Sequence, residues 1–181
     1  EPWVYKYHNK VWKPRNYEKT FRGSITLKDA FSHSVNIPAA KIGVDIGLDK
    51  IIETAHDLGI QESLPEVPSL ILGSVELGSL DVLRAYSTLA NQGTRTDLSA
   101  IQVILDSQNR VLARNIPRTE TPFPQEAIAT LNDLLRTVIT EGTASSLAQH
   151  GYSKLAFGKT GTTSFSRDAW FAGYSEKLVA V

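Results

Sequence analysis

One short segment near the C-terminal end of the chain combines a cation with several hydroxyl groups. In Gly158-Lys-Thr-Gly-Thr-Thr163 a lysine is flanked by two glycines and followed by three hydroxyl residues. On a strand, glycine lets another backbone approach closely, the lysine supplies charge, and threonine hydroxyls supply hydrogen-bond donors. The segment therefore indicates an anion-receiving strand edge. The alternative is an ordinary strand with solvent-facing lysine and threonine.

A phosphate-binding loop is the competing chemical interpretation, because Gly158-Lys-Thr160 matches the end of that motif. The motif requires a glycine five residues before its second glycine, and that position is Ser153. It also requires a helix after the threonine, whereas residues 162–168 lead into another predicted strand. The phosphate-loop interpretation fails on both requirements.

A second segment, Ser34-Val-Asn36, places a serine and an asparagine at the start of a predicted helix, where such residues most often act as caps. Taken together, Ser-x-Asn followed by Lys-Thr-Gly corresponds to two of the three signature elements of class A β-lactamases and penicillin-binding proteins. The chain resembles the transpeptidase domain of class A (bifunctional) penicillin-binding proteins along most of its length. The resemblance is carried by five ordered blocks: Gly23–Ala40, Leu72–Leu77, Ala85–Gly93, Val138–Thr143, and Gly158–Thr163 followed by Arg167–Gly173.

The resemblance implies a D,D-transpeptidase that cross-links peptidoglycan stem peptides ending in D-Ala-D-Ala and that is acylated by β-lactams. Ser34, Asn36 and Lys159 would be catalytic: Ser34 relays a proton, Asn36 binds the substrate amide, and Lys159 attracts the terminal carboxylate. Thr160, Gly161 and Thr162 would bind substrate. No cofactor and no metal are implied.

The first signature element, Ser-x-x-Lys with the nucleophilic serine, has no match, because no serine in the chain is followed by lysine three positions later. We therefore expect the nucleophile on an upstream part of the same protein, with a glycosyltransferase domain and a membrane anchor, at the outer face of the bacterial cytoplasmic membrane or in the periplasm. The chain lacks methionine and stops within a predicted strand, which also suggests a fragment.

The elements that must position these residues indicate an α+β fold, similar to penicillin-binding proteins and serine β-lactamases, with a helical region and an antiparallel sheet. We expect one incomplete domain over 1–181. Residues 1–23 are predicted as an extended loop, 24–150 as mainly helical with a hairpin near 101–114, and 155–181 as antiparallel strands that carry the Lys-Thr-Gly segment. Asn36, Asp49 and Ser79 are the predicted caps of three helices.

Composition excludes several other classes. With 19 Lys+Arg against 19 Asp+Glu the formal net charge is zero, which argues against a nucleic-acid partner. With no cysteine, disulfide scaffolds and thiol nucleophiles are excluded.

Two alternative functions within the same fold stay open: a β-lactamase or D,D-carboxypeptidase with water as acceptor, and a non-catalytic protein that binds β-lactams or peptidoglycan. Val35, where class A β-lactamases favour aspartate, argues against a β-lactamase.

Overall fold

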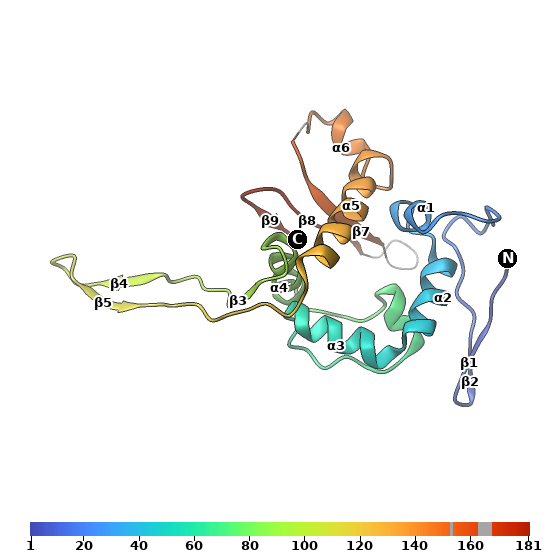
Figure 1. Ribbon diagram of the computed structural model, residues 1–181, viewed down its shortest axis with the longest axis horizontal. Coiled ribbons are helices and arrows are strands. Elements are labelled where there is room, and N and C mark those ends of the chain that lie inside the picture. The colour runs from blue at the N-terminus through green and yellow to red at the C-terminus, as the bar shows by residue number, and fades with distance from the viewer. Residues whose placement is uncertain (153, 163–167) are drawn as a thin grey trace.

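A computed structural model describes residues 1–152, 154–162 and 168–181. Helices hold more of the described residues than strands do, and the described strands fall into four small antiparallel sheets (Figure 1). The helices are α1 (Leu27–Ser32), α2 (Asn36–Ile46), α3 (Leu48–Leu58), the 3-10 helix η1 (Pro68–Leu72), α4 (Ser79–Ala90), α5 (Gln125–Thr140) and α6 (Ser146–Gln149). The strands are β1 (Tyr5–Tyr7), β2 (Lys10–Trp12), β3 (Arg95–Thr96), β4 (Val103–Leu105), β5 (Val111–Arg114), β6 (Thr119–Glu120), β7 (Phe157–Thr162), β8 (Ala169–Tyr174) and β9 (Val179–Ala180).

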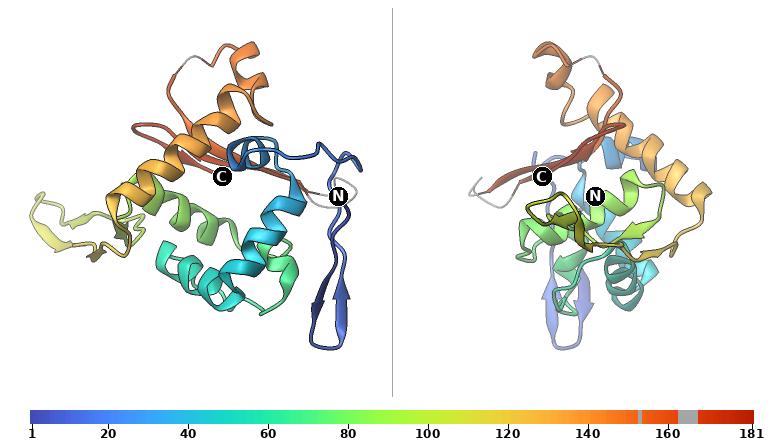
Figure 2. Two further views of the ribbon diagram at one scale, coloured as in Figure 1. Left: turned by 45° about the vertical axis from the view of Figure 1, so that its right-hand side comes forward. Right: turned by 90° about the vertical axis from the view of Figure 1, so that its left-hand side faces the viewer.

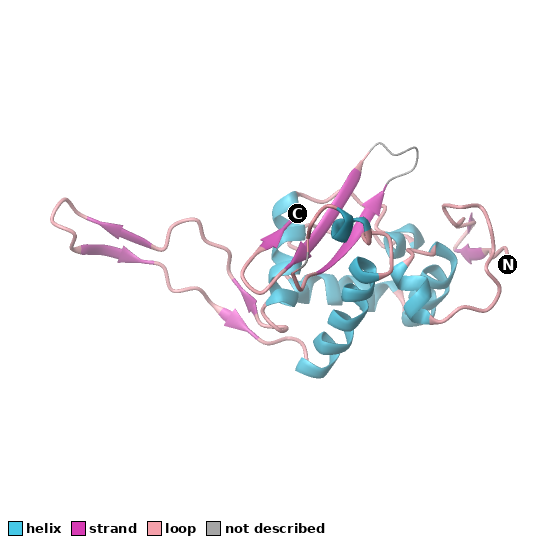
Figure 3. Cartoon of the chain, turned by 90° about the horizontal axis from the view of Figure 1, so that it is seen from above, coloured by secondary structure: helices cyan, strands magenta, loops and turns pink. Residues whose placement is uncertain are grey.

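The central sheet has the order β7-β8-β9, and both pairings are antiparallel, as the short connections predict. Helix α5 packs along β7, and α4 packs against β8. Viewed from above, the sheet lies against the helices (Figure 3). The expected α+β class is confirmed.

The hydrophobic core lies between α5 and this sheet. Leu89, Ile128, Leu135 and Tyr174 form one buried cluster, and Val138, Ile139 and Ala144 form a second. Phe31 of α1 packs against both clusters, so the short helix before Ser34 is held on α5 by its apolar face. Among the described residues, no helix is both long and apolar enough to cross a membrane.

The N-terminal residues 1–23 are not simply an extended loop, because β1 and β2 pair as a hairpin within them. The period-two aromatics explain this: Trp3, Tyr5 and Tyr7 stack in sequence, with ring centroids 5.8 and 6.3 Å apart, and Trp12 meets Trp3 edge-on. Such aromatic pairs stabilise strands. The hairpin stands beside the helices (Figure 2), and Tyr7 reaches the loop before η1 by donating to the carbonyl of Glu66 at 3.1 Å.

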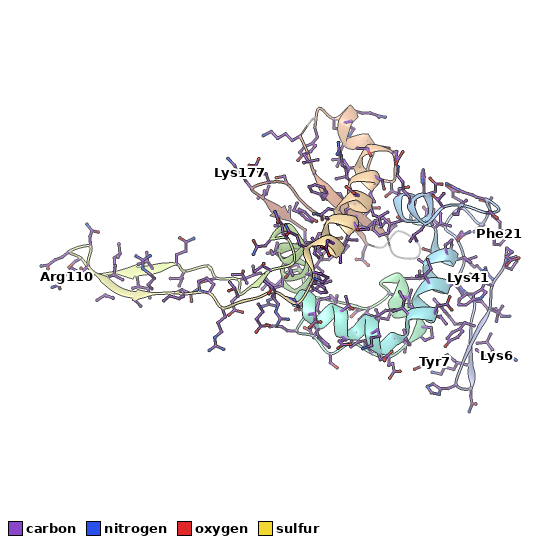
Figure 4. All side chains as sticks on the ribbon, viewed as in Figure 1. Lys6, Tyr7, Phe21, Lys41, Arg110 and Lys177 are labelled. Atoms are coloured by element: carbon purple, nitrogen blue, oxygen red, sulfur yellow. The ribbon has the colours of Figure 1, made fainter. Side chains whose placement is uncertain are left out.

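The hairpin expected near 101–114 is β4–β5, and it projects from the body as a long arm whose tip carries Arg110 (Figure 4). Asp106 builds its turn by accepting the backbone N–H groups of Gln108 and Arg110 at 2.8 and 2.9 Å. The base of the arm is a second pairing, β3 with β6, which no local pattern indicated.

The three predicted helix caps are wrong. The capping positions of α2, α3 and α4 are Val35, Gly47 and Gly78, and none makes a side-chain cap bond. For α2 the cap comes from a distant residue instead: the side-chain oxygen Oδ1 of Asn16 accepts a hydrogen bond from the backbone N–H of Ile37 at 3.1 Å. A partner 21 residues away satisfies the free helix N–H, and local spacing cannot indicate it.

Candidate active site

Ser34 occupies a position in the chain where glycine is usual. The N–H of Ser34 donates to the carbonyl of Phe31 at 3.2 Å, and that of Val35 donates to Ala30 at 2.8 Å. This pair of bonds is the Schellman ending of helix α1, which requires a left-handed residue. Ser34 accordingly has φ +53°. Non-glycine residues in this region are uncommon and often mark functional sites.

Helix α3 ends in the same way and shows what the local backbone prefers. There Gly59 donates to His56 at 2.9 Å, Ile60 donates to Ala55 at 3.1 Å, and Gly59 has φ +110°. Because glycine pays no Cβ penalty in this conformation, the serine that follows α1 is the strained choice. The left-handed backbone of Ser34 lies in the turn between α1 and α2.

Ser34→Gly is expected to be more stable than Ser34→Ala, although both lose the hydroxyl. The left-handed backbone costs an L-residue roughly 1–2 kcal/mol that glycine does not carry. The difference is reduced by the greater freedom of glycine in the unfolded chain, leaving about 1 kcal/mol. For a domain of this size that raises the melting temperature by roughly 2–4 °C. Thermal unfolding of the two variants tests it, and equal melting temperatures would contradict a strained turn.

Lys159 reaches the Ser34 turn from β7. Its Nζ donates to Ser34 Oγ and, at 3.3 Å, to the carbonyl of Thr160. Residues 125 positions apart are thereby joined. Gly158 allows this packing, since a Cβ there would lie 2.5 Å from the ring of Phe171. The structure thus brings together Ser34 and Lys159, to which the family resemblance assigned catalytic roles.

The environment of Lys159 disfavours its charge. The side chain is half-buried, and this desolvation lowers its pKa from the usual 10.5. None of the ion pairs among the described residues includes Lys159. A lysine in this state can attract an incoming anion and can also take part in proton transfer near neutral pH more readily than an exposed one.

The remaining predicted site residues lie close by but differ in their contacts. Thr160 is half-buried next to Lys159, and its hydroxyl oxygen lies 2.6 Å from that of Thr143. Gly161 and Thr162 are exposed at the end of β7. A Cβ on Gly161 would meet its nearest atom at 3.6 Å, which is ordinary contact, so packing within the chain does not require glycine there.

Asn36 follows Ser34 in the first turn of α2. Its Nδ2 donates to the carbonyl of Arg15 at 2.8 Å, so the side chain fastens the N-terminal segment.

Sequence reasoning missed Asn16 and Thr143; the only signal for Thr143 was its place in a family-like block. Ser153, Thr163 and Arg167, which entered the sequence argument, lie outside the described residues.

The arrangement can bind an anion and move a proton. The Lys159 ammonium group donates to the Ser34 hydroxyl, and the hydroxyl of Thr160, the next residue on the strand, contacts the hydroxyl of Thr143 from the turn after α5. A carboxylate binds best to such a combination of charge and donors. A hydroxyl next to a lysine of lowered pKa can relay a proton to a leaving group.

Comparison with known proteins places the chain in a family. Residues 2–180 match the family described as penicillin binding protein transpeptidase domain. The chain is 39 % identical over 171 residues to penicillin-binding protein 1B of Haemophilus influenzae, covering 93 % of this chain and 22 % of that protein. It is 31 % identical to penicillin-binding protein 1B of Escherichia coli, covering 96 % and 21 %. The chain thus spans about a fifth of the length of these relatives.

Solved structures share the fold. The crystal structure of penicillin-binding protein 1A from Haemophilus influenzae superposes with a TM-score of 0.91 at 23 % identity, covering 99 % of this chain and 32 % of that one. An imipenem acyl-enzyme complex of penicillin-binding protein A from Mycobacterium tuberculosis superposes with a TM-score of 0.77 at 16 % identity, covering 96 % and 44 %.

Proposed function

Since the chain belongs to the transpeptidase domain family of penicillin-binding proteins, we propose that it supplies part of the site of a serine-type D,D-transpeptidase that cross-links peptidoglycan stem peptides. The observation that carries the proposal is the bond from Lys159 Nζ to Ser34 Oγ. It joins the two family motifs that the sequence contains at a strained turn and a strand edge. The substrate would be a stem peptide ending in D-Ala-D-Ala, and β-lactams would react in its place.

The nucleophile in this proposal is a serine of a Ser-x-x-Lys motif elsewhere in the full-length protein. The 181 residues contain no such motif, and the relatives are four to five times longer than the matched segment. The serine oxygen attacks the carbonyl of the penultimate D-Ala and forms an ester as the bond to the last D-Ala breaks. The amine of a second stem peptide then attacks the ester and releases the serine. Two easier steps replace one difficult one.

Ser34 and Lys159 act on protons and charge. The leaving D-Ala nitrogen needs a proton, which Ser34 Oγ donates. The ammonium group of Lys159, which is hydrogen-bonded to Ser34 Oγ, gives a proton back to that oxygen. The ammonium group also attracts the carboxylate at the end of the stem peptide. Because the site desolvates Lys159, its interaction with that carboxylate is stronger than it would be in bulk water.

The end of β7 binds the substrate in an extended form. The hydroxyls of Thr160 and Thr162 would hold the carboxylate, and Gly161 would let the substrate backbone approach. The backbone N–H of Thr162 and that of the nucleophile would form the oxyanion hole, worth about 2.7–4 kcal/mol per donor in other enzymes. Asn36 would contact the substrate amide; an amide side chain offers two N–H groups and a carbonyl oxygen, and the bond to Arg15 uses one N–H.

The full-length protein would act with a glycosyltransferase domain of the same chain, at the outer face of the cytoplasmic membrane where stem peptides are found. Its activity is tested by incubation with peptidoglycan strands bearing pentapeptide stems. Release of D-Ala together with cross-linked dimers is the expected result. Release without dimers would indicate a D,D-carboxypeptidase, and binding without release would indicate a non-catalytic relative.

The pH profile of acylation by a penicillin is expected to fall on the alkaline side below pH 10.5. Burial lowers the pKa of Lys159, so the side chain loses its charge at a lower pH than a free lysine. Above that pKa the neutral amine no longer attracts the penicillin carboxylate. Stopped-flow measurement of the acylation rate from pH 7 to 11 shows where this alkaline fall occurs. In Lys159→Arg, whose guanidinium stays charged, the fall of the acylation rate at alkaline pH should disappear. If the fall is unchanged in this variant, the titration of another group causes it.

A further inference from the structure

Thr143, in the turn between α5 and α6, contacts both the Lys-Thr-Gly segment and the end of α1 that precedes Ser34, although the proposed mechanism gives it no part. Its Oγ1 lies 2.6 Å from Oγ1 of Thr160. Its backbone N–H donates to the carbonyl of Ser32 at 3.1 Å. One residue therefore links the strand that carries Lys159 with the helix end that leads into Ser34.

The position of Thr143 is determined by its neighbours on both sides. A Cβ on Gly142 would lie 2.2 Å from the carbonyl oxygen of Ser32, so only glycine lets the turn approach α1 this closely. On the other side, the N–H of Ala144 donates to Val138 at 3.0 Å, and Ala144 is buried in the second core cluster. Packing of this density leaves the turn little freedom to shift.

Binding of a carboxylate would decide which of the two hydroxyls, Thr143 or Thr160, donates in the hydrogen bond between them. Each hydroxyl has one hydrogen to donate. When Thr160 donates its hydrogen to a carboxylate, the hydrogen shared with Thr143 must come from Thr143. The result is a chain of donors from Thr143 to Thr160 to the carboxylate, and successive bonds in such a chain strengthen one another.

We propose that Thr143 is a positioning residue that orients the Thr160 hydroxyl toward the carboxylate of the stem peptide or β-lactam. The proposal rests on the proposed function, because it assumes that Thr160 binds this carboxylate. In this proposal Thr143 acts on the carboxylate through the Thr160 hydroxyl and not on the reacting carbonyl. Its effect is therefore confined to ligands that carry the carboxylate.

The test compares acylation of the full-length protein by a penicillin and by the methyl ester of the same penicillin. Thr143→Val removes the hydroxyl and keeps the shape. We expect the acylation rate with the free acid to fall about fivefold to tenfold, the usual effect of one lost hydrogen bond, while the rate with the ester does not change. Thr143→Ser restores the hydroxyl and should restore the acid rate. Thr140→Val is the matched control, because the Thr140 hydroxyl donates within α5, to the backbone carbonyl of Arg136.

The possible results separate the two proposals. An equal fall with acid and ester, or no fall with either, would overturn the role of Thr143. If thermal unfolding shows that the valine variant folds poorly, Thr143→Ala replaces it. The ratio of the acylation rates with acid and ester is then measured on the alanine variant. If the unchanged protein reacts with neither penicillin, the proposed function itself fails.

Discussion

Ser34→Ala in the full-length protein is expected to lower the rate of cross-linking about 10²- to 10⁴-fold. Proton transfer by a positioned side chain contributes this much in other enzymes, and alanine removes the Ser34 oxygen to which Lys159 Nζ donates. The backbone keeps the same left-handed strain, so the fold is not the cause of the loss. Steady-state formation of cross-linked dimers measures the effect.

A matched serine variant controls for this result. Ser79→Ala changes an exposed serine at the start of α4, far along the chain from both motifs, and it should leave the rate unchanged. If Ser34→Ala kept the full rate, the proton would have another source and the role given to Ser34 would be wrong.

Lys159→Met is expected to lower acylation by penicillins about 10²- to 10³-fold. Methionine has a similar length, but it removes the cation that we propose attracts the carboxylate, and it removes the donor to Ser34. Loss of one pre-oriented electrostatic donor has this size in other enzymes. Fluorescent-penicillin labelling rates of the full-length protein measure it.

The stability of the same variant shows whether the effect concerns the site alone. Burial disfavours the charge of Lys159 and lowers its pKa, so a neutral apolar side chain should not reduce the melting temperature. Lys177→Met, on the exposed turn between β8 and β9 (Figure 4), is the control and should be labelled at the normal rate. A melting temperature several degrees lower for Lys159→Met, with a parallel loss of labelling, would point to a structural lysine.

The parts of this fold that sequence predicted are those that local patterns determine. The apolar spacing of α5 and the three C-terminal strands follow from periodicity, and the turn at Asp106 follows from its side-chain chemistry. The meeting of Ser34 and Lys159 was expected only through the family resemblance, because no local rule relates residues 125 positions apart.

The features that could not be predicted from sequence depend on partners far apart in the chain. Asn36 was predicted as a helix cap, but its side-chain amide donates to the carbonyl of Arg15, and the side chain of Asn16 caps α2 instead. Thr143 became visible only when the turn after α5 docked on Ser32. The strain at Ser34 also arises from tertiary context, since serine alone does not predict a left-handed turn.

The measurement that tests the central claim most directly is the location of a penicillin adduct by mass spectrometry of peptides. The full-length protein and the 181-residue chain are incubated with penicillin and digested side by side. The account predicts an adduct in the full-length protein alone, on the serine of a Ser-x-x-Lys segment. An adduct on Ser34, or on any serine or threonine of the 181 residues, would contradict it.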